Sequence, residues 1–455
     1  MAPDLGSRSP GRGSFTSGLA SRASGACRAS SRPWDGGPVT TPGRNWAETH
    51  TYAATALHRP SSVDELRRAV AESPRVRALG SRHSFHDLAD SPGLLVSLDA
   101  MPREVVVDAD AGTATVGAAA SYAEIAPVLH RSGWALGAMA SLPHISVAGA
   151  VATGTHGSGD AAPTLAGAVT ALETVGPDGD LVWTSEADPD FPGTVVSLGA
   201  LGIVTRVTLR VEPTYDVRQD VRNAVPWETV LTDFDAVSSS ADSVSLFTRW
   251  GTDVVDQVWM KSRRSTEPTV RWGSPATFGQ HPILGIDAVH ATAQLGVGGP
   301  WFERLPHFRA GFTPSVGAEI QSEYLLPRDH ATSAFEALRA LGPRIDPLLL
   351  VSEIRTIPGD DLWLSPAYGR DTVAVHFTLV RDPDAVRRLL PEIEDVLAPF
   401  GARPHWGKWF TLGADRIAEL YPRLPEFRAL ADRRDPDRCF RNAFLERTVL
   451  ADLPD

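Results

Sequence analysis

Two apolar runs in the second half of the chain each carry a pair of polar side chains spaced two residues apart. Glu353 and Arg355 stand in V-S-E-I-R-T, and His376 and Thr378 stand in A-V-H-F-T-L-V. Alternate residues of a β-strand share one face, so each pair would lie on one face while its apolar neighbours take the other. The pattern indicates either a polar pocket or a solvated sheet face with a cross-strand ion pair. By itself it favours the solvated face.

Two glycine-rich stretches in the first half of the chain are candidates for binding an anion. The first is L-G-S-R-H-S-F at residues 79–85, and the second is S-L-P-H-I-S-V-A-G-A-V-A-T-G-T-H-G-S-G at residues 141–159. Backbone N–H groups in such turns can converge on a phosphate. Neither stretch has the dinucleotide-binding or the P-loop motif, and glycine also occurs wherever a turn needs a positive φ. A diphosphate site and two ordinary turns therefore both remain possible.

Taken together with H-W-G-K at residues 405–408, the two stretches resemble those of the alditol oxidases, which are FAD enzymes of the vanillyl-alcohol-oxidase superfamily. The resemblance runs from about Asn45 to Leu450. It implies an α+β, two-domain flavoprotein. One domain would be an FAD-binding domain of the vanillyl-alcohol-oxidase type, and the other an α+β substrate (cap) domain built on an antiparallel sheet. We expect the FAD-binding domain at 44–213, the substrate domain at 214–400, and a C-terminal segment at 401–455 that completes the FAD site.

His83 has two interpretations. An isolated histidine in a turn usually does no more than hydrogen-bond a neighbour. In the alditol oxidases, however, the histidine of this motif is bonded through its ring to the 8α methyl carbon of FAD, which implies covalent FAD at His83. Arg82 replaces the glycine of some members, whereas members that resemble xylitol oxidase carry arginine. A tether at His83 would fix the flavin ring and raise its reduction potential.

The resemblance also implies which other residues contact FAD. His405 and Trp406 are expected to lie against the flavin, and Ala140 falls where related enzymes control the access of oxygen. Alanine there does not distinguish an oxidase from a dehydrogenase. No metal is expected. The expected cofactor-binding residues are Gly80, Ser81, Arg82, His83, Ser84, Ser141, Ser146, Gly149, Thr153, Gly154, Thr155, His156, Val204 and His405.

The same resemblance reverses the preference for a solvated sheet face. An alcohol is a poor hydride donor unless its proton is leaving, so a base and a cation are needed beside the hydroxyl. Lys408 is the expected base, because crowding by Arg355 and partial desolvation would lower its pKa. Arg355 would stabilise alkoxide character, and Glu353 can accept two hydrogen bonds from a vicinal diol. The positions that match the polyol site of alditol oxidases are Ser141, Glu353, Arg355, His376, Thr378 and Lys408.

The predicted function is FAD-dependent oxidation of the terminal primary alcohol of a polyol, of the xylitol or sorbitol type, to the aldose with reduction of O2 to H2O2. The alternative is a sugar-1,4-lactone oxidase of the gulono- or arabinono-lactone type, which shares the glycine-rich loops. A sugar-binding or flavin-storage protein is a third possibility, against which the retained Lys, Arg and Glu argue. The preferred polyol length and stereochemistry remain open, and the resemblance implies a monomer.

Composition sets wider limits. The chain has 455 residues with 42% hydrophobic and 22% charged residues, which suits a globular protein of two or three domains. A net charge of -12 opposes binding to nucleic acid or to an anionic membrane surface. Cys27 and Cys439 provide no disulfide framework, so we expect a cytoplasmic protein. Residues 1–43 are predicted to be a disordered extension, and no apolar run is long enough to span a membrane.

Local patterns predict the elements that must position these residues. Ser62 is expected to begin a helix that ends near Ala71. The stretch 262–318 is irregular and rich in Pro and Gly, which indicates a lid or binding loop or, equally, a surface insertion. Further helices are predicted at 122–130, 330–341, 384–397 and 414–420. Strands are predicted at 46–52, 76–79, 94–98, 104–108, 113–116, 169–175, 180–184, 207–211, 243–249, 257–261, 320–326, 348–357 and 372–380.

Overall fold

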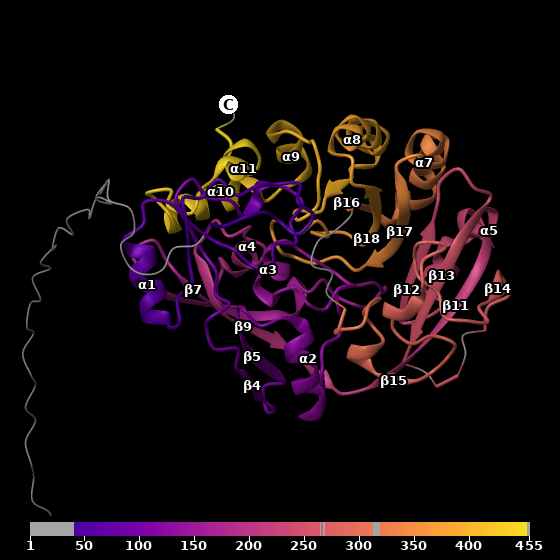
Figure 1. Ribbon diagram of the computed structural model, residues 1–455, viewed down its shortest axis with the longest axis horizontal. Helices are drawn as coiled ribbons and strands as arrows, with labels where there is room; N and C mark the ends of the chain where they lie inside the picture. Colours follow the sequence, from indigo (N-terminus) through magenta and orange to yellow (C-terminus); the bar gives the residue numbers. More distant parts are fainter. Residues whose placement is uncertain (1–40, 264, 267–268, 313–318, 453–455) are drawn as a thin grey trace, which may run out of the picture.

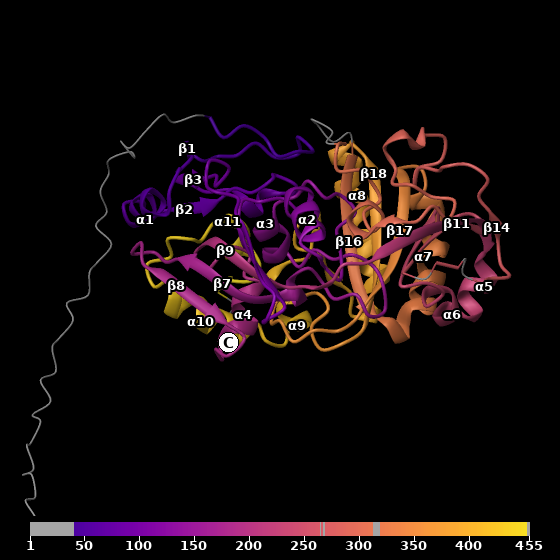
Figure 2. The same cartoon turned by 90° about the horizontal axis from the view of Figure 1, so that it is seen from below.

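The computed structural model describes residues 41–263, 265–266, 269–312 and 319–452. Residues 1–40 of the predicted extension, Cys27 among them, lie outside the described residues. The described strands form four sheets. Figures 1 and 2 show the first half of the chain beside the large sheet of the second half, with the C-terminal helices packed against the first half.

A small parallel sheet with strand order β1–β3–β2 opens the fold. The helix α1 leads from its first strand to the next strand in sequence. Ser62 begins α1 as predicted, because its side chain accepts a hydrogen bond from the backbone N–H of Glu65. The bounds are β1 Ala56–His58, α1 Val63–Ala71, β2 Val76–Ala78 and β3 Leu94–Val96.

A five-stranded antiparallel sheet follows, in the order β4–β5–β9–β7–β8. The helix α2 begins at a capping box, in which the Ser121 side chain binds the Glu124 N–H and the Glu124 side chain binds the Ser121 N–H. The short strands β6 Trp134–Ala135 and β10 Glu212–Pro213 pair separately. The other bounds are β4 Val105–Asp108, β5 Thr113–Gly117, α2 Tyr122–Arg131, α3 Val147–Ala152, β7 Val169–Val175, β8 Leu181–Ser185, α4 Phe191–Val195 and β9 Ile203–Arg210.

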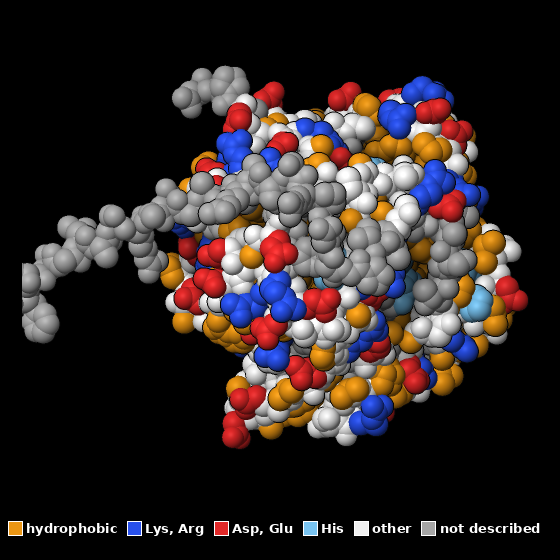
Figure 3. Space-filling model, turned by 60° about the vertical axis from the view of Figure 1, so that its left-hand side comes forward, with side chains coloured by type: hydrophobic (Ala, Val, Ile, Leu, Met, Phe, Trp, Pro, Cys, Tyr) orange, Lys and Arg blue, Asp and Glu red, His pale blue; other side chains and the backbone are white. Residues whose placement is uncertain are grey.

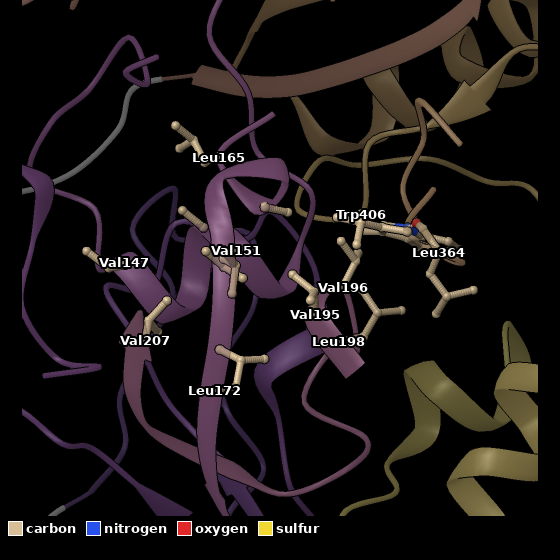
Figure 4. Packing of buried hydrophobic residues seen from close by; sticks show 14 of the residues in the cluster. Val147, Val151, Leu165, Leu172, Val195, Val196, Leu198, Val207, Leu364 and Trp406 are labelled. Carbon is tan, nitrogen blue, oxygen red and sulfur yellow. Dashed lines mark hydrogen bonds between the residues drawn. The ribbon is translucent and has the colours of Figure 1, made fainter. Parts of the chain in front are cut away.

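The core of this half includes side chains from the far end of the chain. Figure 4 shows Val147 and Val151 of α3 packed near residues of β7, β9 and α4. Trp406 and Leu364 belong to the same buried cluster, and the Trp406 indole N–H donates to the Leu364 carbonyl at 2.7 Å. The segment after residue 400 therefore packs against the first half. Its helices are α9 Ala414–Leu420, α10 Leu424–Arg434 and α11 Ala443–Arg447.

The second half forms a nine-stranded sheet whose main path runs β14–β11–β13–β12–β17–β18–β16–β19, with β15 paired to β11. The helices α7 and α8 cover one face, where Ile354 and Phe377 pack with Phe335 of α7 and Leu390 of α8. The strand bounds are β11 Asp216–Pro226, β12 Ser243–Thr248, β13 Val254–Ser262, β14 Ser274–Pro275, β15 Gly299–Pro300, β16 Glu319–Pro327, β17 Leu349–Ile357, β18 Thr372–Val380 and β19 Arg403–Pro404. The helix bounds are α5 Trp227–Thr232, α6 Phe234–Ser238, α7 Ala331–Ile345 and α8 Pro383–Leu397.

Three sequence predictions about local structure are wrong. Residues 46–52 form turns rather than a strand, because the Asn45 side chain bonds both the Thr49 hydroxyl and the His50 N–H. The second glycine-rich stretch contains α3, so only its ends are loops. The eleven-residue strand β11 was not predicted, because charged residues interrupt its apolar pattern. The predicted strands and helices that position the polar pairs are confirmed.

The charges on the surface and the lengths of the helices are relevant to binding of nucleic acid and membranes. Figure 3 shows acidic and basic side chains interspersed on one face, without a broad basic area. Among the described residues, every helix is too short or too polar to cross a bilayer. The face in Figure 3 therefore lacks the basic patch by which proteins hold nucleic acid.

Gly159 ends the second glycine-rich stretch in a conformation that alanine resists. Its φ is +130°, and a Cβ there would lie 2.2 Å from the carbonyl oxygen of Asp242. We expect Gly159→Ala to lower the free energy of unfolding by about 1–3 kcal/mol, measured by urea denaturation. Gly413→Ala is the control, because nothing lies within 4 Å of its Cβ position. Equal unfolding midpoints for the two variants would contradict the expectation.

Candidate active site

The polar pairs lie on the sheet face opposite α7 and α8. The strand register places Glu323, His376 and Glu353 directly beside one another across β16, β18 and β17. These side chains are buried, with exposed fractions of 2%, 8% and 6%. The interpretation as a solvated sheet face is therefore wrong, because the first half of the chain covers this face. One such contact joins His156 and Glu323, whose Nε2 and Oε1 atoms are 3.2 Å apart.

Arg355 lies between two carboxylates on this face. Its Nη2 donates to Glu323 Oε1 at 2.5 Å, and its Nε lies 3.5 Å from Glu353 Oε1. Burial opposes the guanidinium charge, but the charges of Glu353 and Glu323 outweigh burial and raise the pKa of Arg355. Burial acts to raise the pKa of both carboxyls, yet Arg355 holds each pKa below its usual range. The three groups are therefore fixed as a charged cluster.

Lys408 reaches this cluster from the H-W-G-K segment. Its Nζ donates to Gln321 Oε1, which also lies 3.2 Å from His376 Nε2. The ammonium stands over the ring of Phe85, 5.1 Å from the ring centre. Burial is the main cause that lowers the pKa of Lys408; the Glu323 charge opposes the shift and the Arg355 charge adds to it. This is the direction expected of a lysine that serves as a base.

His83 lies in a second group, which the first half of the chain forms by itself. Its Nδ1 donates to the Ser81 carbonyl at 2.8 Å, and its Nε2 lies 2.8 Å from His144 Nε2. The Trp46 ring stacks on the imidazole at 5.0 Å. Burial and then the nearby His144 lower the pKa of His83 to about 3. The ring is therefore neutral at physiological pH.

A glycine cradle adjoins His83. A Cβ at Gly80 would lie 2.9 Å from Ser146 Oγ, and one at Gly149 would lie 2.7 Å from the same atom. Ser146 Oγ is buried and has no hydrogen-bond partner among the described residues. The exposed backbone of Gly80 and Gly149 and the free hydroxyl of Ser146 can hydrogen-bond a phosphate or the edge of a flavin ring. The residues present therefore fit FAD.

Other predicted cofactor residues lie in the same two glycine-rich stretches, and the Thr153 hydroxyl donates to the Gly149 carbonyl of the cradle at 3.0 Å. The Arg82 side chain extends toward Pro42 and Tyr52, and its φ of +64° explains why relatives can carry glycine there. A Cβ at Gly154 would meet Pro366 at 3.0 Å. The Thr153 and Thr155 hydroxyls lie 3.2 Å apart.

Three further predicted cofactor residues contact other parts of the chain. The Ser84 carbonyl accepts from the Asn45 side chain at 2.9 Å. Val204 is half-buried in β9, and its side chain packs against the apolar cores. His405 is buried near His156, with the two ring centres 5.9 Å apart.

His156, Glu323 and His405 offer ligand atoms within 4.8 Å of one another. Such a trio can bind a transition metal. Here the Glu323 oxygen that faces His156 also accepts from Arg355, and a cation would face Arg355 and Lys408. We therefore assign the trio to the charged network.

A cavity of about 620 Å³ opens between the two halves of the chain. Ser141 and Arg355 line it, as the prediction of a substrate site requires. Lys261 and His307 line it as well, and neither was predicted. The other predicted substrate residues Glu353, His376 and Thr378 lie on the same sheet face as Arg355, and Lys408 reaches this face from residues 405–408.

Sequence reasoning missed several residues of the site. Gln321 and Glu323 show the same two-residue spacing that identified Glu353 and Arg355, so their signal was present. Lys261 was visible as a charge at the end of an apolar strand. His307 and His144 gave no signal, because each lies in a loop far from its partner in sequence.

Solved structures show the same fold. A cholesterol oxidase from B. sterolicum matches with a TM-score of 0.73 at 15% identity, over 91% of this chain and 97% of that chain. A solvent-stable cholesterol oxidase gives 0.72 at 15% identity, over 90% and 97% of the two chains. Residues 54–185 match the family model of an FAD binding domain. Fold and matched domain define a flavin-dependent oxidoreductase of the vanillyl-alcohol-oxidase superfamily, with an FAD-binding domain and an α+β second domain.

Sequence relatives narrow the class. Residues 317–448 match the family model of D-arabinono-1,4-lactone oxidase. An L-gulono-1,4-lactone dehydrogenase of Mycobacterium tuberculosis is 30% identical over 89% of this chain and 98% of its own length. An alditol oxidase of Streptomyces sp. is 48% identical over 90% of this chain and 99% of its own length. The chain belongs to the alditol oxidase family.

Proposed function

We propose that this enzyme oxidises the terminal primary alcohol of a polyol such as xylitol or sorbitol to the aldose and passes the electrons to O2, forming H2O2. The observation that carries the proposal is the buried pair Arg355 and Glu353 on one sheet face, with the half-buried Lys408 beside it. Together they join a base, a cation and a hydrogen-bond acceptor for hydroxyls. The 48% identity to an alditol oxidase supports the polyol as substrate.

The mechanism assigns each step to a side chain. Lys408 Nζ, in its neutral form, takes the proton of the reacting hydroxyl, and Arg355 stabilises the alkoxide character that develops. Glu353, kept ionised by Arg355, accepts hydrogen bonds from neighbouring hydroxyls and orients the chain. FAD, when bound, supplies the hydride acceptor and the route to O2. The Gly80, Ser146 and Gly149 cradle would hold it.

The proposal extends to the organisation of the enzyme. It includes a covalent bond between His83 and FAD, a monomer and a cytoplasmic location. It also includes the division at residue 213. The strands of the large sheet support this division because they start at Asp216, although β19 of the C-terminal segment joins the same sheet.

Peroxide release tests the substrate. The purified holoenzyme is supplied in parallel with xylitol, sorbitol, L-gulono-1,4-lactone and D-arabinono-1,4-lactone in air. We expect peroxide and flavin reduction with the polyols. The lactones test the second candidate function, lactone oxidation, which the family model over residues 317–448 favours. Faster turnover of the lactones would show that the enzyme is a lactone oxidase instead. If no substrate reduces the flavin, both candidate functions are wrong.

Acid precipitation tests the tether. We expect the flavin to pellet with the wild-type polypeptide and to remain in the supernatant with His83→Ala. His144→Ala is the matched control, because its ring contacts His83 at 2.8 Å but is not the proposed bonded residue. Free flavin from the wild-type protein would contradict a covalent bond.

The rate is expected to depend on pH through Lys408. Only the neutral amine can take a proton, and burial keeps the pKa of Lys408 below its usual value. Consequently, kcat/KM for xylitol should rise with pH and level off below about pH 10, before an ordinary lysine would be half deprotonated. Steady-state rates between pH 6 and 10 check this. A rate that falls through this range would assign the proton transfer to another group.

A further inference from the structure

Lysine is rare in this chain and is confined to the site. Of 43 basic residues only two are lysines, Lys261 and Lys408, and the others are arginine. Lys261 lines the cavity and is only 1% exposed, whereas Lys408 is half-buried beside the Glu323–Arg355–Glu353 cluster. Arginine cannot lose its proton in a protein, whereas lysine is compact and can. Lys408 has a proposed role, and Lys261 has none.

Lys261 lies at the end of β13, and its ammonium meets three acceptors. Its Nζ donates to the carbonyl of Leu305, to the carbonyl of Pro306 at 3.2 Å and to His307 Nδ1 at 3.0 Å. An ammonium has three N–H donors and no acceptor, so these contacts use all of them. Lys261 therefore fastens the turn at 305–307 to the sheet.

The contact with Lys261 determines how His307 is protonated. His307 Nδ1 accepts from the ammonium, so the proton of the neutral ring lies on Nε2. Nε2 is 2.7 Å from Glu353 Oε1 and donates to it. The edges of Phe247 and Trp259 pack against the imidazole, with ring centres at 5.3 and 5.4 Å. The ring is thereby fixed in place, and burial supports its neutral state by lowering its pKa to about 4.

The same turn also fixes Ser141. The backbone N–H groups of His307 and Phe308 both donate to the Ser141 carbonyl, at 3.2 and 3.3 Å. One short segment thus joins Ser141, from the second glycine-rich stretch, to Glu353 on β17. Within 262–318, residues 305–308 therefore connect two parts of the chain, which a surface insertion would not do.

We propose that Lys261 and His307 are positioning residues for substrate: Lys261 sets the tautomer of His307, whose Nε2–H orients the Glu353 carboxylate toward the hydroxyls of the substrate. The proposal rests on the proposed function only in naming a polyol as the molecule that Glu353 binds. Neither residue takes part in the proton transfer to Lys408.

Two substitutions of His307 distinguish the effect of its N–H donor from the effect of the bulk of its ring. Glutamine has an N–H group that can reach Glu353 and an oxygen that can accept from Lys261, whereas phenylalanine has the bulk alone. We expect His307→Phe to lower kcat/KM for xylitol by about 10²-fold, since misplacing a substrate group by about 1 Å costs that much. His307→Gln should stay within about fivefold of wild type. Lys261→Met should match His307→Phe, and the double variant should lose no more than either, because both act through one hydrogen bond.

Arg249→Met is the control, since Arg249 pairs with Asp256 on the same β-hairpin but outside the site. It should behave as wild type. If His307→Gln and His307→Phe lose activity equally, the donor is not what matters and the proposal is wrong. The proposal is also wrong if both variants retain full activity.

A spectroscopic measurement covers variants that fold poorly and does not depend on turnover. Protein labelled with 13C at lysine Cε gives two signals, one for each lysine. We expect His307→Phe, which removes the acceptor for Lys261, to move the Lys261 signal and to leave the Lys408 signal unchanged. Titration of the wild type should give Lys261 a pKa near 7, because burial lowers it. An unmoved Lys261 signal would refute its contact with His307. If the wild-type enzyme does not oxidise polyols, the proposed function is wrong. The lysine signals still test the contact between Lys261 and His307 in that case.

Discussion

Replacing Lys408 by methionine is expected to lower kcat/KM for xylitol by about 10²- to 10⁴-fold, the usual contribution of a positioned base. Methionine keeps the length and the apolar stem of the side chain but cannot take a proton. The Phe85 ring and the Gln321 amide that contact the ammonium can still pack around it. Stopped-flow measurement of flavin reduction under anaerobic conditions isolates this step from the reaction with oxygen.

The control keeps the protein and its cofactor intact. Lys408→Met should retain the wild-type flavin absorbance and melting temperature, because the hydrogen bond of Lys408 Nζ goes to Gln321 of the large sheet, whereas Gly80, Ser146 and Gly149 form the cradle. The variant should also lose the rise of the rate with pH. A loss smaller than about tenfold would assign the base to another group, since one misplaced hydrogen bond costs about that much.

Arg355→Met is expected to lower the free energy of unfolding at pH 7 by about 3–5 kcal/mol and to abolish polyol oxidation. The substitution leaves Glu323 and Glu353 buried without their shared counter-charge. Urea denaturation of the holoenzyme at several pH values measures the difference. The large cost arises from burial, because water can no longer stabilise the two carboxylates.

The pH dependence follows from the direction of the two carboxyl shifts. In the folded wild type the pKa values of Glu323 and Glu353 are held below the unfolded value of about 4.3. Their contribution to stability is therefore present above pH 4.3 and is lost as the pH falls through the folded values. The difference between Arg355→Met and wild type should therefore be fully present above about pH 4.3 and shrink as the pH falls below that value. A difference that is independent of pH would mean that packing, not charge, is the cause.

A surface pair provides the comparison for this prediction. Arg210 and Glu186 lie 2.7 Å apart, and their side chains are 62% and 50% exposed. Arg210→Met should cost only about 0–1 kcal/mol, because water solvates the remaining carboxylate. Equal losses for Arg210→Met and Arg355→Met would show that burial of the Glu323–Arg355–Glu353 cluster does not determine its energy.

Local patterns predicted much of the fold. The spacing of Glu353 and Arg355 predicts a strand with one polar face, and that strand is β17. Ser121 and Glu124 begin α2 as a capping box, although only the helix was predicted. The turn around Asn45 could not be predicted, because the side-chain bonds that replace a strand depend on where its neighbours lie.

The sequence alone determined the chemical types at the site: a base at Lys408, a cation at Arg355, an acceptor at Glu353 and the histidine of a flavin motif at His83. Only the tertiary structure decided that the polar face is buried and that Glu323 joins it as a second partner of Arg355. It also decided that His307, 46 residues from Glu353, lies within a hydrogen bond of it. The reason is physical: residue type and spacing specify a strand face, but burial and long-range contacts depend on which other segment packs against that face.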